Sequence, residues 1–381
     1  MTGTAAGEES KIGQQAARAE RLAAELGERG VDALLVDAPV DLRYLTGFTG
    51  SHGLAILGAS QAGRTSDGRH RFFTDFRYTT QSAEQVPETF SREIVTGNLL
   101  EAAARSLNDA GGTLGFDEDS TTVADHARLR AALSERWTLD PCAGAVERPR
   151  AIKDAQEIAR IRAAAELADE ALRGVLEDGV VGRAERDVAI DLELRMRRLG
   201  AQAPSFPSIV AAGAHGALPH AEPRAEPIPR DVLLTIDWGA LLDGYCSDCT
   251  RTYATGERIS AQARETYELV LAAQQQGVAA VTAGPTGREV DAVARAVIER
   301  AGQGEHFGHG LGHGVGMEVH EGPRLSRTDG EERLSAGNVV TVEPGVYLPD
   351  RLGVRIEDLL VVLEDGCEVL SGLDKALTVI S

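Results

Sequence analysis

The first part of the chain alternates short apolar runs with stretches in which apolar residues recur every three or four positions. The short runs predict buried strands, and the periodic stretches predict amphipathic helices. The expected strands are 33–36, 54–57, 72–74 and 113–116, and the expected helices are 18–29, 99–108 and 123–134. Strands that alternate with helices are typical of a small α/β domain.

The second part of the chain has a different order of elements. It opens with a predicted helix, whose apolar residues are spaced three or four apart: Ile158, Ile161, Ala165, Ala168, Leu172 and Val175. There follow a helix at 185–199, strands at 208–212 and 232–238, helices at 261–281 and 287–301, and strand-rich sequence from 314 to 379. Two helices followed by strands, twice over, predict a pseudo-duplicated α+β domain.

A segment with two prolines and mixed charges, residues 141–153, separates the two patterns. The length of 381 residues is enough for two domains that each have a core. We therefore expect a flexible N-terminal tail at 1–14, an α/β domain at 15–148 and an α+β domain at 149–381.

The amino-acid composition of the chain restricts the kinds of molecule that it is expected to bind. Hydrophobic residues make up 43% of the chain and charged residues 26%, as in folded globular proteins, and 39 basic against 59 acidic residues give a formal net charge of −20. An acidic surface repels nucleic-acid phosphates and anionic membranes, so we expect neither as a partner. Scattered cysteines, no leader-like start and no apolar run near the roughly 20 residues of a membrane span predict a cytoplasmic protein.

Four carboxylic acids lie within or at the end of apolar, strand-forming segments. Asp237 ends one such segment, Asp248 follows a predicted hairpin at 239–244, Glu343 ends NVVTV, and Glu357 interrupts GVRIEDLLVV. A buried carboxylate is costly unless it is paired or bound to a metal. Two divalent cations would balance these four negative charges.

Histidines crowd into the same part of the chain. The glycine-rich stretch FGHGLGHGVGMEVHEGP contains His309, His313 and His320. We expect His313 to be the nitrogen ligand, and an oxygen-rich site with one imidazole suits Mn, Co or Zn. From the residues alone, the alternative is that the carboxylates cap turns or pair with arginines, for example Glu357 with Arg355.

Four segments resemble the metal-binding motifs of one enzyme family: IDWGALLDGYCSDCTRT, GHGLGHGVGMEVHEGP, VTVEPGVY and GVRIEDLLVV. The family comprises prolidase, aminopeptidase P, creatinase and methionine aminopeptidase, and its catalytic domain has the pita-bread fold. The resemblance implies two divalent metal ions, with Mn expected and Co or Zn as alternatives. The implied metal ligands are Asp237, Asp248, His313, Glu343 and Glu357.

The N-terminal segments DLRYLTGFTGSHG and FFTDFRYTTQSAEQ resemble the creatinase-type amino domain. Residues 15–148 are therefore expected to form this domain, and residues 149–381 the pita-bread domain. The family resemblance also implies a homodimer. Two departures from the family pattern, His215 and Cys249, are expected to lie near the metals.

Within the family the chain is most similar to Xaa-Pro peptidases, that is, aminopeptidase P and prolidase. The resemblance implies hydrolysis of the bond between an N-terminal residue and a following proline, in a di- or oligopeptide, by a hydroxide that bridges two cations. The residues implied to act on the substrate are Glu343 as general acid and base, His220, His309 and His320 around the reacting amide, and Arg324, Arg355 and His220 in substrate binding.

Two other functions stay open at this point. One is hydrolysis of a different small amide or non-peptide compound, and the other is a non-catalytic binding role on the same fold. The residues do not distinguish a dipeptidase from an aminopeptidase, and they do not identify the native metal.

Overall fold

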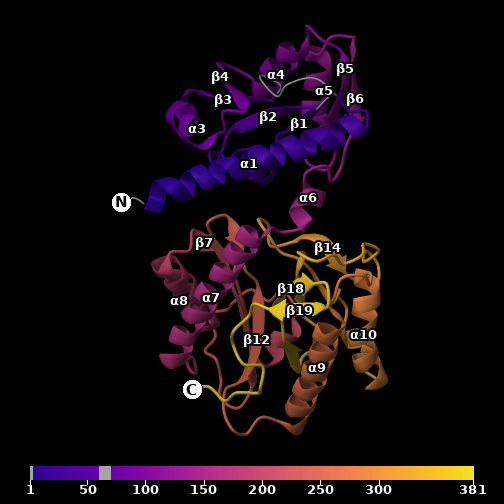
Figure 1. Cartoon of the computed structure of the whole chain (residues 1–381). Coiled ribbons are helices and arrows are strands. Elements are labelled where there is room, and N and C mark those ends of the chain that lie inside the picture. The colour runs from indigo at the N-terminus through magenta and orange to yellow at the C-terminus, as the bar shows by residue number, and fades with distance from the viewer. Residues whose placement is uncertain (1–2, 60–69) are drawn as a thin grey trace. The chain divides into compact units, whose positions relative to one another are not determined.

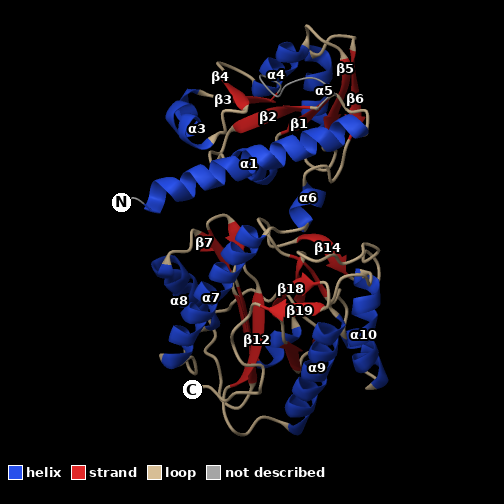
Figure 2. Cartoon of the chain, in the orientation of Figure 1, coloured by secondary structure: helices blue, strands red, loops and turns tan. Residues whose placement is uncertain are grey.

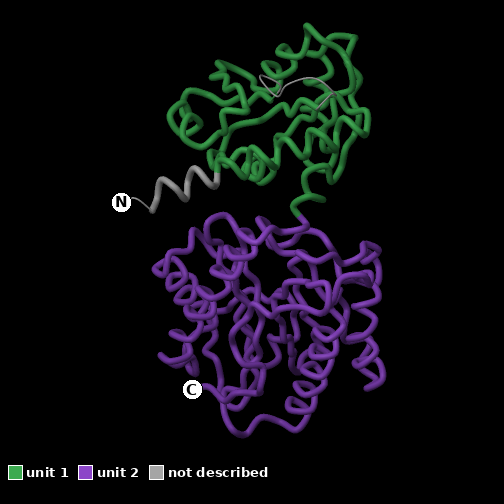
Figure 3. The backbone as a smooth tube through the Cα atoms, viewed as in Figure 1, with its two compact units in different colours: residues 1–150 green, residues 151–381 purple. Residues whose placement is uncertain are grey.

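The computed structural model describes the backbone of residues 3–59 and 70–381, and the side chains in these ranges from residue 12 onward. The chain folds as two compact units, residues 1–150 and 151–381, which Figure 3 shows in different colours. The boundary predicted after residue 148 falls inside a short helix, α6 (Glu147–Ala151). The flexible tail expected at 1–14 stays a prediction; helix α1 (Gly3–Glu28) includes most of these positions and begins well before the expected residue 18.

The N-terminal unit is a six-stranded sheet with helices (Figures 1 and 2). Besides α1 and α6 it contains β1 (Ala33–Val36), α2 (Pro39–Thr46), β2 (Gly53–Gly58), β3 (His70–Thr74), the 3-10 helix η1 (Phe76–Tyr78), α3 (Thr79–Gln85), β4 (Phe90–Ile94), α4 (Leu99–Leu107), β5 (Gly112–Phe116), α5 (Val123–Ala132) and β6 (Trp137–Pro141). The strand order is β4-β3-β2-β1-β5-β6. This arrangement confirms the α/β domain predicted from the sequence.

The two edge strands of this sheet, β4 and β6, were missed by the sequence pattern. Four of the five residues of β4 are exposed, and β6 is mostly exposed after Trp137. Such strands lack the apolar run from which a strand is predicted, because they pair on one side only and bury few side chains.

The C-terminal unit carries two pairs of helices and many short strands (Figure 2). Its elements are α7 (Ala155–Glu177), α8 (Glu185–Leu199), β7 (Ala203–Pro204), β8 (Ile209–Ala212), η2 (Gly213–Ala217), β9 (Leu233–Trp238), β10 (Ala240–Leu242), β11 (Tyr245–Cys246), β12 (Cys249–Ala254), α9 (Ala261–Ala280), α10 (Gly287–Arg300), η3 (Gly304–His306), β13 (Gly312–Gly314), β14 (Glu321–Leu325), β15 (Val339–Val342), β16 (Gly345–Leu348), β17 (Leu352–Arg355), β18 (Asp358–Leu363) and β19 (Gly366–Val369). The order of two helices and then strands occurs twice, as predicted.

Each helix pair packs on its own group of strands. Leu172 of α7 and Leu192 of α8 lie in one buried cluster with Ile236 of β9. Val270 of α9 and Val290 of α10 lie in another cluster with strands β15 to β18. Burying a side chain of this kind contributes about 1.5–3 kcal/mol. Packing on helices therefore fixes the strands next to the acidic residues: β9 on the α7–α8 pair, and β15 to β18 on the α9–α10 pair.

The pairing of β9 with β12 brings two of the acidic residues together. The strands are antiparallel, with Asp237 opposite Thr250 and Trp238 opposite Cys249. Asp248 immediately precedes β12, so it lies at the same end of the ladder as Asp237. A small hairpin forms where one was expected at 239–244, but its second strand, β11, begins one residue beyond that range.

The 3-10 helix η2 lies directly against β17. A Cβ atom added to Gly353 of β17 would lie 1.8 Å from the carbonyl oxygen of Gly216 in η2. Only glycine fits at this backbone contact, so Gly353 determines how closely the loop after β8 approaches the sheet.

We expect Gly353→Ala to destabilise the protein by about 2 kcal/mol, because the new methyl group overlaps the Gly216 carbonyl and one backbone must move. The free energy of unfolding in urea measures the effect. Gly308→Ala is the matched control, since a Cβ there meets nothing within 4 Å. Equal stability of the two variants would contradict the close contact.

Candidate active site

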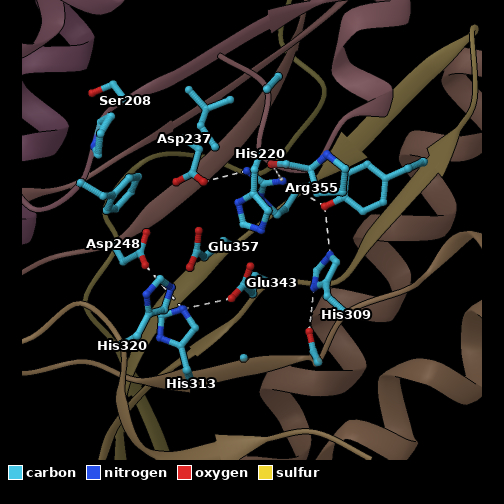
Figure 4. Close-up of a pocket in the computed structure, with 18 of the residues that line it drawn as sticks. Ser208, His220, Asp237, Asp248, His309, His313, His320, Glu343, Arg355 and Glu357 are labelled. Carbon is cyan, nitrogen blue, oxygen red and sulfur yellow. Dashed lines mark hydrogen bonds and ion pairs between the residues drawn. The ribbon is translucent and has the colours of Figure 1, made fainter. Parts of the chain in front are cut away.

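One cavity of the C-terminal unit, with a volume of about 670 Å³, is lined by every site residue that the sequence predicted. These residues are His220, Asp237, Asp248, His309, His313, His320, Arg324, Glu343, Arg355 and Glu357. Figure 4 shows the acidic side chains facing one another across this cavity, with His313 and His320 below them and His309 to one side. Segments that lie more than 100 residues apart in the sequence, such as those of His220 and Glu357, therefore meet at one site.

Three of the proposed ligands form a tight group. One ligand atom each from Asp248, His313 and Glu357 lies within 4.8 Å of the other two, and all three residues are buried. His313 Nε2 also lies 3.2 Å from Glu343 Oε1. Asp237 faces the same cavity from β9. A compact set of oxygen atoms with one imidazole nitrogen is a donor set that binds Mn, Co or Zn.

The cavity raises the pKa of three of its carboxyl groups. Burial is the main cause for Asp237, Asp248 and Glu357, and repulsion by neighbouring carboxylates adds to it. Burial alone would also raise the pKa of Glu343, but the contact with His313 lowers it to about 2. The site therefore holds more negative charge than its basic side chains neutralise.

The backbone fixes the orientation of the His313 ring. Its Nδ1 lies 3.1 Å from the carbonyl oxygen of Gly314, which can only accept a hydrogen bond. Nδ1 therefore carries the proton, and in the neutral ring Nε2 offers its lone pair toward Asp248 and Glu343. A hydrogen bond from the second ring nitrogen to a carbonyl is typical of metal-ligating histidine.

Two oxygens of the group have no hydrogen-bond partner although they are buried, Asp237 Oδ1 and Glu357 Oε1. The other oxygen of each residue is bonded, Asp237 Oδ2 to Arg355 Nη2 at 2.7 Å and Glu357 Oε2 to Thr250 Oγ1 at 2.7 Å. A buried carboxylate oxygen without a partner is costly. Divalent cations would remove this cost, so the residues present fit a metal site.

Arg355 does not pair with Glu357, which was the alternative considered from the sequence. Its guanidinium instead binds Asp237, the Tyr347 hydroxyl at 2.9 Å, the Pro219 carbonyl at 3.1 Å and Thr250 Oγ1 at 3.1 Å. Arg355 is 4% exposed, and these four bonds use most of its five N–H groups. Arg355 therefore orients Asp237, and its role in binding substrate stays a prediction.

His309 is bonded through both ring nitrogens. Nδ1 donates to the Gly310 carbonyl at 2.8 Å, which leaves Nε2 to accept from the Tyr347 hydroxyl at 3.0 Å. Arg355 donates to the same hydroxyl, so Tyr347 links His309 to the Arg355–Asp237 pair. Burial lowers the pKa of His309 and raises that of Tyr347, so both groups are neutral near pH 7.

Sequence reasoning missed Tyr347 and Thr250. Both lie inside motifs named above, Tyr347 in VTVEPGVY and Thr250 in YCSDCTRT. A hydroxyl group within an apolar strand is the sequence feature that could have identified them. Of the two departures expected near the metals, Cys249 does contact the carbonyl of Glu357, at 3.5 Å. His215 does not line the cavity; its Nδ1 donates to Glu185 at 2.8 Å.

Two family models match the chain: metallopeptidase family M24 over residues 159–364, and the creatinase/prolidase N-terminal domain over residues 18–152. The chain belongs to metallopeptidase family M24. As an M24 peptidase it has the predicted architecture, a creatinase-type amino domain followed by a pita-bread domain. It is therefore a hydrolase of a family that depends on metal ions.

The relatives of this M24 peptidase include proteins named for proline peptides. An uncharacterized peptidase of Bacillus subtilis is 42% identical over 364 residues, with 95% of this chain and 99% of the relative covered. A Xaa-Pro dipeptidase of Pyrococcus furiosus is 34% identical over 361 residues, with 94% and 99% covered. Among solved structures, a Xaa-Pro dipeptidase from Bacillus anthracis is 37% identical with a TM-score of 0.89 over 96% of this chain and 99% of that one. An X-Pro aminopeptidase from Thermotoga maritima is 33% identical with a TM-score of 0.82, over 92% and 97%.

We expect Mn²⁺ to stabilise the metal-free enzyme, because the cation relieves repulsion among the buried carboxylates. At 100 times its dissociation constant the gain is about 2.7 kcal/mol, or roughly 5–10 °C in Tm. Asp248→Asn keeps the shape of the side chain and removes one charge. Its metal-free form should melt no lower than the wild type, and Mn²⁺ should raise its Tm by much less. An equal Mn²⁺ shift in both proteins, measured by calorimetry after chelation, would exclude Asp248 as a ligand.

Proposed function

We propose that this M24 peptidase is a metal-dependent Xaa-Pro peptidase, which hydrolyses the bond between an N-terminal residue and a following proline. The observation that carries the proposal is the convergence of all five expected ligands, three histidines and a free arginine on one cavity. The relatives named Xaa-Pro dipeptidase and X-Pro aminopeptidase support the same substrate class. Turnover of Ala-Pro or Ala-Pro-Ala by the Mn-loaded enzyme tests it, and failure to cleave either peptide would overturn it.

Asp237, Asp248, His313, Glu343 and Glu357 would hold two divalent cations, with Mn expected and Co or Zn as alternatives. Bound cations supply Lewis acidity, which polarises the scissile carbonyl and lowers the pKa of water to near neutrality. Glu343 is the carboxylate placed for proton transfer. It lies at the cavity surface with a side chain 18% exposed, and its pKa of about 2 keeps it ionised. It accepts the proton of the attacking water and returns it to the proline nitrogen that leaves.

His320 and His220 face the reacting amide. Burial, together with His313 and Arg324 nearby, lowers the pKa of His320 to about 4, so its ring is neutral at pH 7. A neutral imidazole carries one N–H, which can donate to the substrate oxygen as negative charge develops there. His309, with both nitrogens already bonded, would contribute by aligning Tyr347 beside the substrate. A bond to proline is a tertiary amide without N–H, which suits a pocket that recognises the ring by shape.

Arg324 is the group available for the carboxylate of the substrate. It is exposed, it lines the cavity, and its guanidinium forms no ion pair with any residue of the described ranges. Arg355, by contrast, is buried and engaged by Asp237. A guanidinium binds a carboxylate in a bidentate manner, so we infer that Arg324 recognises the free carboxyl end of a dipeptide.

Hydrolysis of another small amide or non-peptide compound is the second candidate, left open by a relative that is named only as an uncharacterized peptidase. A non-catalytic role is less well supported because every expected ligand is present. The predicted homodimer, cytoplasmic location and absence of nucleic-acid or membrane partners stay predictions. In the described part of the chain, no helix combines the length and the apolar character that a membrane span needs.

We expect Glu343→Gln to lower kcat for Ala-Pro by about 10²–10⁴-fold, the range typical for loss of a general acid or base. The amide has nearly the same shape but cannot accept the proton. Glu305→Gln, at a side chain 84% exposed in the same region, should leave kcat unchanged. Metal content is measured on both variants, and wild-type activity of Glu343→Gln with bound metal would refute this role.

We expect Arg324→Ala to raise KM for Ala-Pro about tenfold, because a hydrogen-bonded charge pair is lost. KM for Ala-Pro-amide, which has no carboxylate, should change much less. Arg327→Ala is the matched control, since Arg327 is exposed two residues beyond β14 and does not line the cavity. Equal effects of Arg324→Ala on the two substrates would show that Arg324 does not read the carboxylate.

A further inference from the structure

Glu185 lies outside the cavity, yet its carboxylate is the meeting point of several donors. It is the first residue of helix α8 and is 1% exposed. Oε1 accepts from the backbone N–H of Ala212 at 2.9 Å and from Arg224 Nη2 at 3.3 Å. Oε2 accepts from His215 Nδ1 at 2.8 Å, and from the backbone N–H and Nε of Arg224 at 3.1 and 3.2 Å. A buried carboxylate with this many donors is held in one position.

The three partners of Glu185 belong to one loop. Ala212 ends strand β8, His215 lies in η2, and Arg224 closes the segment. The residues between His215 and Arg224 include five that line the cavity: Pro219, His220, Ala221, Glu222 and Pro223. Glu185 therefore ties both ends of the loop together and holds its first turn. The part of the loop between these two ends forms one wall of the cavity, from which the His220 ring points inward (Figure 4).

A second set of contacts fixes the opposite side of the loop. The carbonyl of Gly216 lies against Gly353, and the carbonyl of Pro219 accepts a hydrogen bond from Arg355 at 3.1 Å. Arg355 in turn binds Asp237. The loop is thus held between Glu185, which carries no direct role in the site, and the residues that orient a metal ligand.

We propose that Glu185 and His215 are positioning residues, which clip the base of the 212–224 loop and so set the distance of the His220 wall from the metal ligands. The clip acts on the substrate side of the site, because the wall faces the substrate while the expected metal ligands lie on or beside other strands. The inference rests on the proposed function for its kinetic part only. It also gives a role to His215, whose imidazole serves as a hydrogen-bond donor rather than as a group near the metals.

The test compares His215→Ala with His215→Asn in the full-length, Mn-loaded enzyme. Asn Nδ2 is bonded to Cγ, as His Nδ1 is, so asparagine can replace the donor to Glu185 and alanine cannot. Four quantities are measured: amide hydrogen exchange of residues 213–224, kcat and KM for Ala-Pro, and the metal content. Asp187→Asn is the control, since Asp187 lies on the same turn of α8, is exposed, and its side chain accepts no hydrogen bond from a described residue.

For His215→Ala we expect exchange in 213–224 and KM each to rise about tenfold, the loss expected when a hydrogen bond to a charged group is removed. Metal content should stay within about twofold of wild type, because no expected ligand moves. The value of kcat should fall as well, because the displaced wall carries His220, which faces the reacting amide. His215→Asn should restore both exchange and KM. Glu185→Gln should open the loop further; where this buried variant does not fold, the His215 pair still decides.

Unchanged exchange of the loop in His215→Ala overturns the proposal. So does a rise in KM that His215→Asn does not reverse, or one accompanied by a loss of bound metal, which would point to general damage. A wild-type enzyme that does not cleave Ala-Pro contradicts the proposed function alone. In that case the hydrogen exchange of the same variants still decides whether the clip exists.

Discussion

Repulsion among four carboxylates in one buried cavity is the constraint on which the C-terminal unit is built. Asp237, Asp248 and Glu357 have raised pKa values because burial and mutual repulsion both disfavour their charged forms. Such a group stays together only where the surrounding structure holds each side chain firmly. The antiparallel β9–β12 ladder and the two helix pairs supply that rigidity, and cations supply the missing charge.

A second set of residues, behind the expected ligands, holds the repelling side chains in place. Arg355 neutralises Asp237 from one side, Thr250 holds Glu357, and Gly314 orients His313 through its carbonyl. Each of these bonds uses one atom of the ligand and leaves the other atom turned into the cavity. The same set of residues reaches the substrate wall, because Arg355 also binds the Pro219 carbonyl. Metal binding and the shape of the pocket therefore share one set of hydrogen bonds.

Much of this could be predicted from the sequence, and the failures have physical causes. The gathering of the acidic residues at one site was predictable because an acidic residue in an apolar strand violates the pattern around it, as Asp237 and Glu357 do. Edge strands such as β4 were missed because they bury too little to leave an apolar run. The actual partner of Arg355 could not be found from the sequence, since spacing within a strand offered only Glu357 as an alternative while Asp237 lies 118 residues away.

The buried strands and the exposed loops determine different properties of the site: the strands carry the chemistry, and the loops shape the pocket for the substrate. The expected metal ligands lie on or beside paired strands, and all but Glu343 are buried, so changing them disturbs the core as well as the chemistry. His220 and Arg324 are exposed at the cavity wall, where substitution costs little stability. In the proposed peptidase, preference for a dipeptide or a longer peptide would depend on these exposed groups and on how loops such as 212–224 are held. A clip like Glu185–His215 would therefore allow specificity to change while every expected metal ligand is kept.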